Sequence, residues 1–408
     1  MRILLIHPAC TVQLADFCDF LRKTYLHEIV LLTGRQGLQL PGVRVVTYRP
    51  SRQPSPQGHP YVTPAEDAVL QGQAAYRAAA GELKSQGFIP DVIYGYAGWG
   101  PTLYMKDLFP GIPLICNFEW FTHTDNLAFF FPGQDPTIDK ACRIRTQNAR
   151  IVIDLYSCDL GITPTYYQKS KFPPEYAEKI KVLHDGVNTQ LYRPKRGYKL
   201  VLPEGKLDCS QVAELVTYVV NGQEHYSGYR QFMEAASIIQ RRPKCHILVC
   251  GAGVRNLERK MADGKTYKQH IIDSCSLDIN RIHFLDDLPA PWYSQIFQAS
   301  TVHVYLTEPF FLSFSLLEAM SCGCALVASN TPPVKEMLLD GVNGLLADMQ
   351  SPQDIANKIE ELLDHPGRRE VLAVRARECI LERYDTARVF PEKLKLFTDS
   401  QIFKKTGP

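Results

Sequence analysis

Two glutamates and two serines lie close together in the second half of the chain, within residues 301–320. Residues 301–306 (TVHVYL) are apolar and rich in β-branched and aromatic side chains, which predicts a buried strand that ends just before Glu308. Ser313 or Ser315 then begins a helix, because serine is a preferred N-cap and apolar residues follow at helical spacing. The unpaired N–H groups at such a helix start bind anions such as phosphates.

The two glutamates of this stretch each have a simple structural interpretation. Glu318 completes a capping box with Ser315, in which a glutamate three residues further on bonds the start of its own helix. Glu308 precedes Pro309 at the end of a strand, where a carboxylate is commonly a solvated loop residue. A chemical role for either glutamate therefore depends on a ligand at the helix start.

Further candidates follow strands in the first half of the chain. Glu119 comes after the apolar run 113–116 and precedes Trp120, and ligand sites gather at the carboxyl ends of parallel strands. A carboxylate among aromatic residues could hold hydroxyl groups of a ligand, and a hydrogen-bonded structural glutamate fits equally well. His184 and Asp185 follow the last strand of this half, and we interpret them as a hinge pair.

Two series of alternating strands and helices position these residues. In the first half, the apolar runs that predict strands are 2–6, 27–32, 43–48, 91–94, 113–116, 160–163 and 180–183. In the second half they are 214–220, 246–250, 281–285, 301–306 and 325–328. Residues 137–157 predict one long helix. Repeated βα units of this kind predict an α/β fold with doubly wound parallel sheets.

Length and composition limit the number of domains and the kinds of partner that are expected. The 408 residues exceed the roughly 250–300 that one core usually serves, so two domains are expected. The polar segment 193–213, broken by Pro and Gly, predicts the linker between them. The net charge of +2 gives no reason to propose nucleic acid or an acidic membrane as the main partner.

The cysteines and the apolar runs indicate in which cellular compartment the protein is expected. The twelve cysteines form no C-x-x-C pair, and we interpret them as reduced core residues of a cytoplasmic protein. The first residues, 1–6 (MRILLI), are too short a run for a signal-peptide core. No run approaches the roughly 18 apolar residues of a membrane-spanning helix.

The stretch 306–346 resembles the donor-binding signature of the family-4 retaining glycosyltransferases, also known as group 1, which have the two-domain GT-B fold. The resemblance rests on Glu308-Pro309-Phe310, Leu316-Leu317-Glu318-Ala319-Met320, the run 321–329 (SCGCALVAS), and the shorter pieces 98–100, 117–119, 163–165 and 184–187. It implies two Rossmann-like domains that face each other across a cleft. The acceptor domain would be 1–192, with the helix of 387–408 crossing back onto it, and the donor domain 214–386.

In that family two glutamates flank the phosphate-binding helix start, the second holding the ribose and the first the transferred sugar. Glu318 matches the second, whereas Phe310 stands in the place of the first, so Glu308 is the candidate for the sugar contact. The residues that the resemblance assigns to the donor are Glu318, Leu312, Ser313, Phe314, Ser315, Leu316, Gly253, Arg255, Arg230 and Asp286.

The chain departs from the family where two cations usually reach the diphosphate. Asn221 and Ser227 stand at the places of an arginine and a lysine. A helix start contributes about 0.3–1 kcal/mol and a charge-assisted hydrogen bond about 1.5–3 kcal/mol, so a helix alone would not replace both cations. Arg230 and Arg255 are the candidates that would compensate. No two aspartates form a D-x-D pair, which favours a metal-free mechanism.

On the acceptor side the resemblance points to Gln13, Tyr96, Trp99 and His123. Tyr96 stands where the bacterial subgroup tends to have a histidine, and Pro101 where it tends to have an acidic residue, and both changes weaken the case for a general base. Retaining enzymes of this family are thought to let the departing phosphate oxygen take the acceptor proton.

The resemblance therefore predicts a retaining, metal-independent transfer of a hexose from a nucleotide-diphosphate sugar, foremost a UDP-sugar, to an acceptor hydroxyl. Glu308 and Glu119 would be the catalytic residues, and the nucleotide sugar would be a co-substrate, with no further cofactor. The acceptor would be a saccharide, a lipid-linked saccharide or a small molecule. The alternatives are a catalytically silent relative that acts as a binding subunit, and a sugar-nucleotide epimerase with the same fold.

Overall fold

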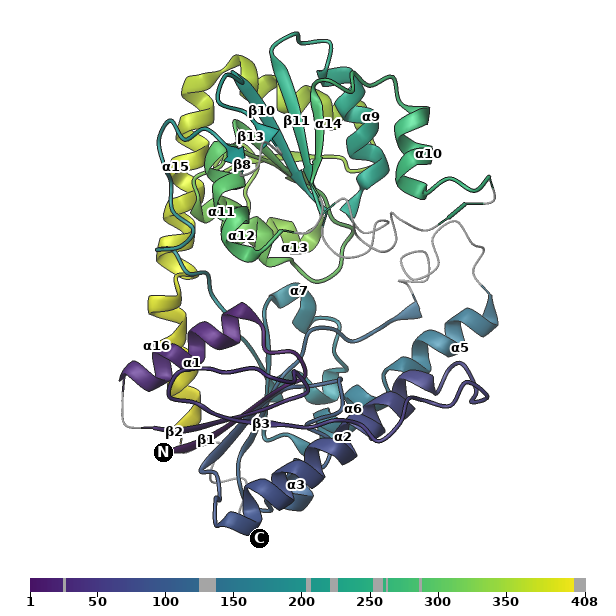
Figure 1. The fold of residues 1–408 in the computed structure, drawn as a ribbon, viewed down its shortest axis with the longest axis vertical. Coiled ribbons are helices and arrows are strands. Elements are labelled where there is room, and N and C mark those ends of the chain that lie inside the picture. The colour runs from purple at the N-terminus through teal and green to yellow at the C-terminus, as the bar shows by residue number, and fades with distance from the viewer. Residues whose placement is uncertain are drawn as a thin grey trace. The chain divides into compact units, whose positions relative to one another are not determined.

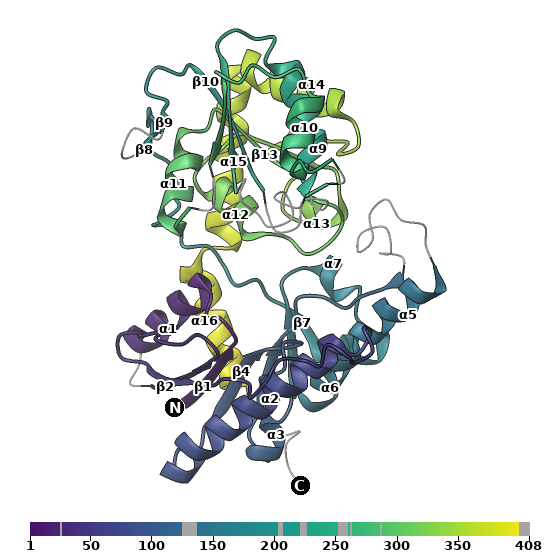
Figure 2. The ribbon, with the colours of Figure 1, turned by 45° about the vertical axis from the view of Figure 1, so that its right-hand side comes forward.

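A computed structural model of the chain describes residues 1–24, 27–124, 137–202, 207–220, 227–251, 260–261, 263–285 and 288–399. These residues form two compact units, each built on one parallel sheet with helices on both faces (Figure 1; Figure 2). The first unit combines Met1–Gly186 with the chain from Arg388 onward, and the second unit is Val187–Ala387.

The first unit contains a seven-stranded sheet in the order β3-β2-β1-β4-β5-β6-β7. Its strands are β1 (Arg2–His7), β2 (Glu28–Thr33), β3 (Arg44–Thr47), β4 (Val92–Tyr96), β5 (Leu114–Asn117), β6 (Leu160–Thr163) and β7 (Ile180–Val182). All neighbours are parallel, so the carboxyl ends of the strands lie at one edge of the sheet.

Helices bury both faces of this sheet. On one face, alternate residues of β1 pack against α2 (Thr63–Glu82) and α6 (Ala149–Ser157). On the other face, the remaining residues of β1 pack against α1 (Val12–Thr24) and α16 (Thr386–Phe397). A strand that is buried on both faces is predominantly apolar, which is why these strands can be recognised in the sequence.

The last helix of the chain is part of the first unit. The Phe17 ring of α1 lies 5.1 Å from the ring of Phe390 and 5.9 Å from that of Phe397. In both views α16 lies beside α1 (Figure 1; Figure 2). The helix α16, which is more than 200 residues from Asp185 in sequence, therefore completes the core of the first unit.

The second unit contains a six-stranded parallel sheet in the order β12-β11-β10-β13-β14-β15 and a two-stranded hairpin, β8-β9. The strands are β8 (Val201–Leu202), β9 (Leu207–Asp208), β10 (Glu214–Val219), β11 (Cys245–Cys250), β12 (Ile282–Leu285), β13 (Val302–Tyr305), β14 (Leu326–Ser329) and β15 (Leu345–Ala347). The helices are α9 (Tyr229–Ile239), α10 (Tyr267–Ser274), α11 (Ala290–Ala299), α12 (Phe314–Ser321), α13 (Pro332–Lys335), α14 (Pro352–Asp364) and α15 (Pro366–Arg383).

The structure contains each strand that was expected from an apolar run. The expected long helix over 137–157 is wrong: it is divided into α5 (Ile138–Gln147) and α6, because the Asn148 amide bonds both the N–H and the carbonyl of Thr122. The segment 193–213, expected as a linker, carries the β8-β9 hairpin and contributes buried side chains to a core of the second unit. The short helices α3 (Met105–Leu108) and α7 (Tyr166–Lys169) complete the first unit.

Candidate active site

In the second unit, β10 and β13 are neighbouring parallel strands whose following helices cover opposite faces of the sheet. α9 follows β10 and contributes Tyr229 to one core cluster, and α12 follows β13 and contributes Leu316 to the other. Open α/β sheets bind their ligands at the carboxyl ends of strands at such a switch point. The starts of α9 and α12 therefore mark the candidate donor site.

The start of α12 is fixed by its own hydroxyl groups. Ser313 is the N-cap, and its Oγ accepts a hydrogen bond from the N–H of Ser315 at 3.3 Å. The Ser313 N–H donates to the hydroxyl of Tyr305, at the end of β13, at 3.0 Å. Leu312, Ser315 and Leu316 are buried, and Ser313 and Phe314 are partly buried. The expected helix start is confirmed, with Ser313 as the capping residue.

The capping-box interpretation of Glu318 is wrong. Because Ser313 is the N-cap, the box position three residues on is occupied by the buried Leu316. Glu318 is only partly exposed and bonds the side chain of Tyr192, and burial raises the pKa of its carboxyl to about 7. A half-buried carboxylate next to a helix start is placed to accept hydrogen bonds from a ligand.

Glu308 lies at the same edge of the sheet. Its Oε1 accepts a hydrogen bond from Nε2 of Gln350 at 3.1 Å, and Gln350 in turn accepts one from Gln231 of α9 at 3.3 Å. Burial raises the pKa of Glu308, and the bond from Gln350 opposes that change. The preceding Thr307 exchanges hydrogen bonds with Ser329 at the end of β14, which anchors the loop. Glu308 is thus a held side chain, not a freely solvated one.

The start of α9 is tightly packed. Gly228 has a φ of 67°, which favours glycine, and a Cβ there would lie only 3.0 Å from Met349. The adjacent Ser227 is buried, and its carbonyl accepts a bond from the hydroxyl of Tyr218. Arg230 pairs with Glu234 at 2.9 Å on the outside of the helix, where 63% of its side chain is exposed. Arg230 is therefore engaged elsewhere on α9.

Four residues expected at or beside the donor site lie outside the residues that the structure describes. They are Asn221, Gly253, Arg255 and Asp286.

In the first unit, the carboxylate of Asp185 connects several strand ends. It accepts hydrogen bonds from the hydroxyl of Tyr96 at 3.1 Å and from the amide of Asn117 at 3.4 Å. Its other oxygen is paired with Lys393 of α16, whose side chain is 2% exposed. Burial opposes ionisation of Asp185, but Lys393, His184 and the Tyr96 hydroxyl together outweigh it and lower the pKa of Asp185. The pair is a buried ion pair just before the chain enters the second unit.

Two histidines beside this carboxylate are neutral. His7, at the end of β1, packs edge-on against Tyr96 with ring centroids 4.5 Å apart. Its Nδ1 accepts bonds from the N–H groups of Ala9 and Cys10, and burial lowers its pKa to about 4. His184 accepts a bond from the N–H of Gly186, and burial lowers its pKa to about 4 as well.

The remaining candidates of the first unit form no hydrogen bond to Asp185 among the described residues, but desolvation and the nearby charge of Asp185 raise the pKa of the Glu119 carboxyl. Trp99 is 47% exposed, with the Arg150 guanidinium 5.9 Å from its ring centroid. Gln13 is partly exposed in the first turn of α1, and Glu119 is exposed. The ring of His123 bonds the carbonyl of Lys171. Among the described residues, no hydrogen bond joins Gln13, Glu119 or His123 to the Asp185 group.

Several residues of these networks were not expected from the sequence. His7 directly follows an apolar strand, a position from which it could have been found. Lys393 lies in an ordinary amphipathic helix, and Gln350 in a turn before α14, so neither position gives a signal. Their roles arise from contacts between segments distant in sequence.

Two kinds of feature are absent from the described part of the chain. No group of three or more His, Cys, Asp or Glu side chains there is placed to hold a metal ion. No helix among those residues is both long and apolar enough to cross a membrane.

Two family models match the chain. The glycosyl transferase family 4 group matches residues 26–192, and the glycosyl transferases group 1 model matches residues 211–379. An uncharacterised glycosyltransferase of Methanocaldococcus jannaschii is 31% identical over 119 residues, which are 29% of this chain and 30% of that protein. The D-inositol 3-phosphate glycosyltransferase of Thermobispora bispora is 23% identical over 65% of this chain and 60% of its own length. The match therefore spans less than two thirds of these relatives.

Solved structures resemble the whole chain. The sucrose-phosphate synthase of Thermosynechococcus elongatus superposes with a TM-score of 0.73 at 14% identity, covering 99% of this chain and all of that one. HepE of Anabaena, solved in complex with UDP and glucose, gives a TM-score of 0.67 at 18% identity, covering 98% of this chain and 99% of that one. These likenesses show the fold. Together with family-model matches to both halves, they identify the chain as a group 1 glycosyltransferase with the GT-B fold.

Proposed function

We propose that this chain transfers a hexosyl group from a UDP-sugar to an acceptor hydroxyl, with retention of configuration and without a metal ion. The observation that carries the proposal is the start of α12, where a serine-capped helix begins beside the half-buried Glu318 at the switch point between β10 and β13. HepE, a structural relative, was solved in complex with UDP-glucose, which supports a UDP-sugar as the donor.

The helix start would stabilise the leaving group. As the bond to the sugar breaks, negative charge grows on the diphosphate, and N–H groups fixed beforehand at the start of α12 would receive it. Glu318 would accept hydrogen bonds from the ribose hydroxyls, and Glu308, held by Gln350, would contact the transferred sugar. The sequence has no D-x-D pair, so the proposal involves no metal.

The acceptor side supports proton transfer to the leaving phosphate. The Tyr96 hydroxyl donates a hydrogen bond to Asp185, and burial raises its pKa above the usual value, so the phenol stays protonated near neutral pH and cannot act as a base. In His7, Nδ1 already accepts backbone hydrogen bonds, and the ring gains a proton only near pH 4. With neither side chain serving as a base, the phosphate oxygen would take the acceptor proton on the same face of the sugar, which gives retention.

One observation favours a second candidate, a catalytically silent relative that acts as a binding subunit. Arg230, expected to replace a missing cation, is paired with Glu234, and the neutral Ser227 is buried. A silent relative would bind UDP weakly or would bind it without turnover.

The test is a thermal-shift titration with UDP and UDP-glucose. At a ligand concentration of about 100 times the dissociation constant, binding adds about 2.7 kcal/mol, which raises the melting temperature by several degrees. Glu318→Ala should remove this shift, whereas the control Glu378→Ala, at an exposed position of α15, should keep it. Equal shifts in parent and Glu318→Ala would end the proposed role of Glu318. Release of glucose or a glycosylated product then separates an active enzyme from a silent one.

A further inference from the structure

The loops after β1 and β4 lie at the point where the sheet of the first unit changes its order. β1 and β4 are neighbouring parallel strands, with β2 and β3 on one side and β5, β6 and β7 on the other. The helix after β1 contributes Leu14 to one core cluster and the helix after β4 contributes Met105 to the other, so the two helices cover opposite faces. Open α/β sheets bind ligands outside the carboxyl ends of the strands at such a switch point. The residues that follow β1 and β4 therefore mark the candidate acceptor site.

Trp99 is an exposed aromatic residue in the turn that directly follows β4. It is 47% exposed, whereas Trp120 is 8% exposed and Trp292 is partly buried. Exposed tryptophans are enriched where a ligand or a partner covers one side of the ring. The place of this ring at the switch point therefore indicates a ligand that packs against it.

The turn that carries Trp99 is held from both sides. Gly98 and Gly100 have φ values of 80° and 104°, which favour glycine. The Gly98 N–H donates to the buried carboxylate of Asp154, on α6, at 2.8 Å. A Cβ at Gly100 would clash with the carbonyl oxygen of Ala68, so the turn packs directly against the backbone of α2. The backbone beneath the ring is thus fixed before a ligand arrives, which lowers the entropy cost of binding.

A charged hydrogen-bond donor lies beside the ring. The Arg150 guanidinium is 5.9 Å from the centroid of the Trp99 ring. Burial lowers the pKa of Arg150, the carboxylates of Asp67 and Asp154 oppose that change, and the group stays charged. A pyranose ring has the matching chemistry. The C–H groups of its faces pack against a flat aromatic ring, and the hydroxyls at its rim accept hydrogen bonds from a guanidinium.

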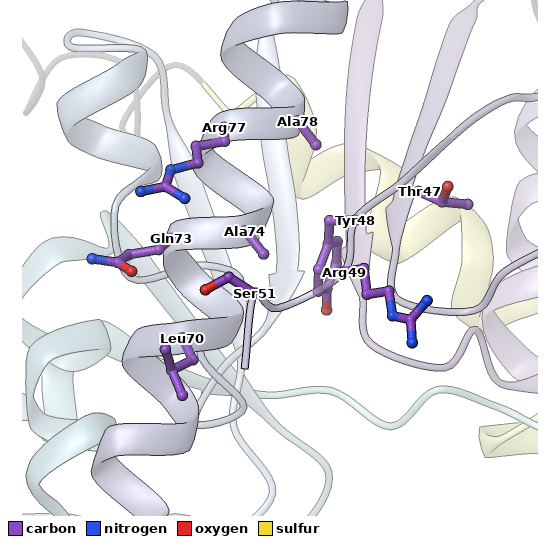
Figure 3. Close-up of a pocket in the computed structure, with 9 residues that line it drawn as sticks. All are labelled: Thr47, Tyr48, Arg49, Ser51, Leu70, Gln73, Ala74, Arg77 and Ala78. Carbon is purple, nitrogen blue, oxygen red and sulfur yellow. The ribbon is translucent and has the colours of Figure 1, made fainter. Parts of the chain in front are cut away.

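A cavity of about 210 Å³ on another side of α2 lacks such an arrangement (Figure 3). It lies beside the loop after β3, and its two arginines, Arg49 and Arg77, extend in opposite directions (Figure 3). The two groups would not converge on one ligand. This cavity therefore does not compete with the turn at Trp99 as an acceptor site.

We propose that the acceptor is a saccharide and that one face of a pyranose ring stacks on Trp99. The proposal rests on the proposed function, since it concerns the acceptor to which the hexosyl group is transferred. Arg150 would donate to hydroxyls at the rim of the stacked ring, and Asp154 is a positioning residue that holds the turn through Gly98. A free saccharide and the terminal sugar of a lipid-linked saccharide present the same ring, so both are sources of this ligand.

Titration of the full chain with methyl glycosides of glucose, galactose, mannose and N-acetylglucosamine, with and without UDP, tests the proposal. At least one glycoside should bind and shield Trp99 from fluorescence quenching by acrylamide, whereas glycerol, which has hydroxyls but no ring, should not. Trp99→Ala and Trp99→Leu, measured by calorimetry, should raise the dissociation constant of that glycoside about tenfold, the size expected when a stacked aromatic ring is lost. Trp99→Phe keeps a flat ring and should raise it about threefold or less.

Tyr156→Ala is the matched control, since Tyr156 is an aromatic residue of the same unit that is 80% exposed and lies outside this turn. Its glycoside affinity should equal that of the parent. The melting temperature of Trp99→Phe should equal that of Trp99→Leu, so that a difference in their affinities reports the flat ring and not unfolding. Equal glycoside affinity in the parent, Trp99→Ala and Trp99→Leu, or binding of none of the glycosides, would overturn the proposal.

The octyl form of the glycoside that binds, used below its critical micelle concentration, identifies the source of the ring. A dissociation constant lower than that of the methyl form assigns a lipid-linked saccharide, and an equal one assigns a free saccharide. The thermal shift with UDP-glucose, measured on the same variants, should not change. A chain that binds UDP-glucose but no glycoside refutes this inference alone, whereas a chain that binds a glycoside through Trp99 but no UDP-glucose refutes the proposed donor.

Discussion

Glu318 is an acid whose ionisation depends on the folded state. Its ordinary pKa of 4.5 is raised to about 7 because the side chain is largely removed from water, and the hydrogen bond from Tyr192 offsets only part of that effect. Between these two values the unfolded chain releases this proton while the folded chain keeps it. The free energy of unfolding therefore decreases as pH rises from about 4.5 to about 7.

This linkage predicts a pH-dependent loss of stability that one substitution removes. Over the full interval the loss is at most about 3 kcal/mol, which corresponds to several degrees in the melting temperature of the second unit. Glu318→Gln cannot ionise, so its melting temperature should change less between pH 5 and pH 8 than that of the parent. Circular-dichroism melts at the two pH values measure this difference, and Glu378→Gln is the control. Identical pH dependence in parent and Glu318→Gln would show that Glu318 ionises normally in the fold.

At the scale of elements, α16 is joined to the strand ends of the first unit by a buried ion pair. Lys393 is 2% exposed and also lies over the rings of Phe17 and Tyr94. Burying two charges costs desolvation energy, so such a pair adds little stability relative to apolar residues, but the loss of one partner leaves an unpaired buried charge. The pair therefore fixes α16 to Asp185 and, through it, to Tyr96.

Replacing one partner of this ion pair should lower the free energy of unfolding more than replacing both partners. Lys393→Met leaves the Asp185 carboxylate buried and unpaired, which typically costs about 3–5 kcal/mol, and Asp185→Asn leaves the ammonium in the same state. The double variant Asp185→Asn/Lys393→Met removes both charges and should recover most of the loss. Melting temperatures of the four proteins form a double-mutant cycle. Additive losses would mean that the two side chains do not interact.

The boundaries of strands and helices show which elements could be predicted from sequence patterns alone. Strands β1, β6 and β13 match their apolar runs within a residue, because a strand covered on both faces is predominantly apolar. The division of 137–157 at Asn148 was not predictable, because it depends on a bond to Thr122, which is distant in sequence. The apolar pattern continues across the break, since α5 and α6 each bury one face.

At the scale of the whole molecule, the two units differ in whether one continuous segment of the chain supplies the complete core. The second unit, Val187–Ala387, covers both faces of its sheet with its own helices, whereas Met1–Gly186 lacks the helix that carries Phe390, Lys393 and Phe397. A fragment 187–387 should therefore fold alone with a cooperative melt. A fragment 1–186 would expose Phe17 and leave Asp185 unpaired, so it should melt at a lower temperature or remain partly unfolded.

A fusion of the first fragment with the last helix provides the control for this prediction. Joining residues 386–399 to the first fragment through a flexible linker should restore its cooperative melt, while the same fusion carrying Lys393→Ala should not restore it fully. Fluorescence and circular-dichroism melts measure both. A fragment 1–186 that melts like the fused form would show that α16 is dispensable for the first core.

The sequence by itself determined the two sheets, the strand positions, a helix start at Ser313 or Ser315 and the membership in a glycosyltransferase family, because these depend on local patterns that folding preserves. Tertiary structure decided which polar side chains meet. Asp185 and Lys393 are 208 residues apart, and the bond between Glu318 and Tyr192 replaces the capping box that the sequence suggested. Buried charges and hydroxyls are bonded to residues that are distant in sequence, and the periodicity of the sequence does not show which residues these are.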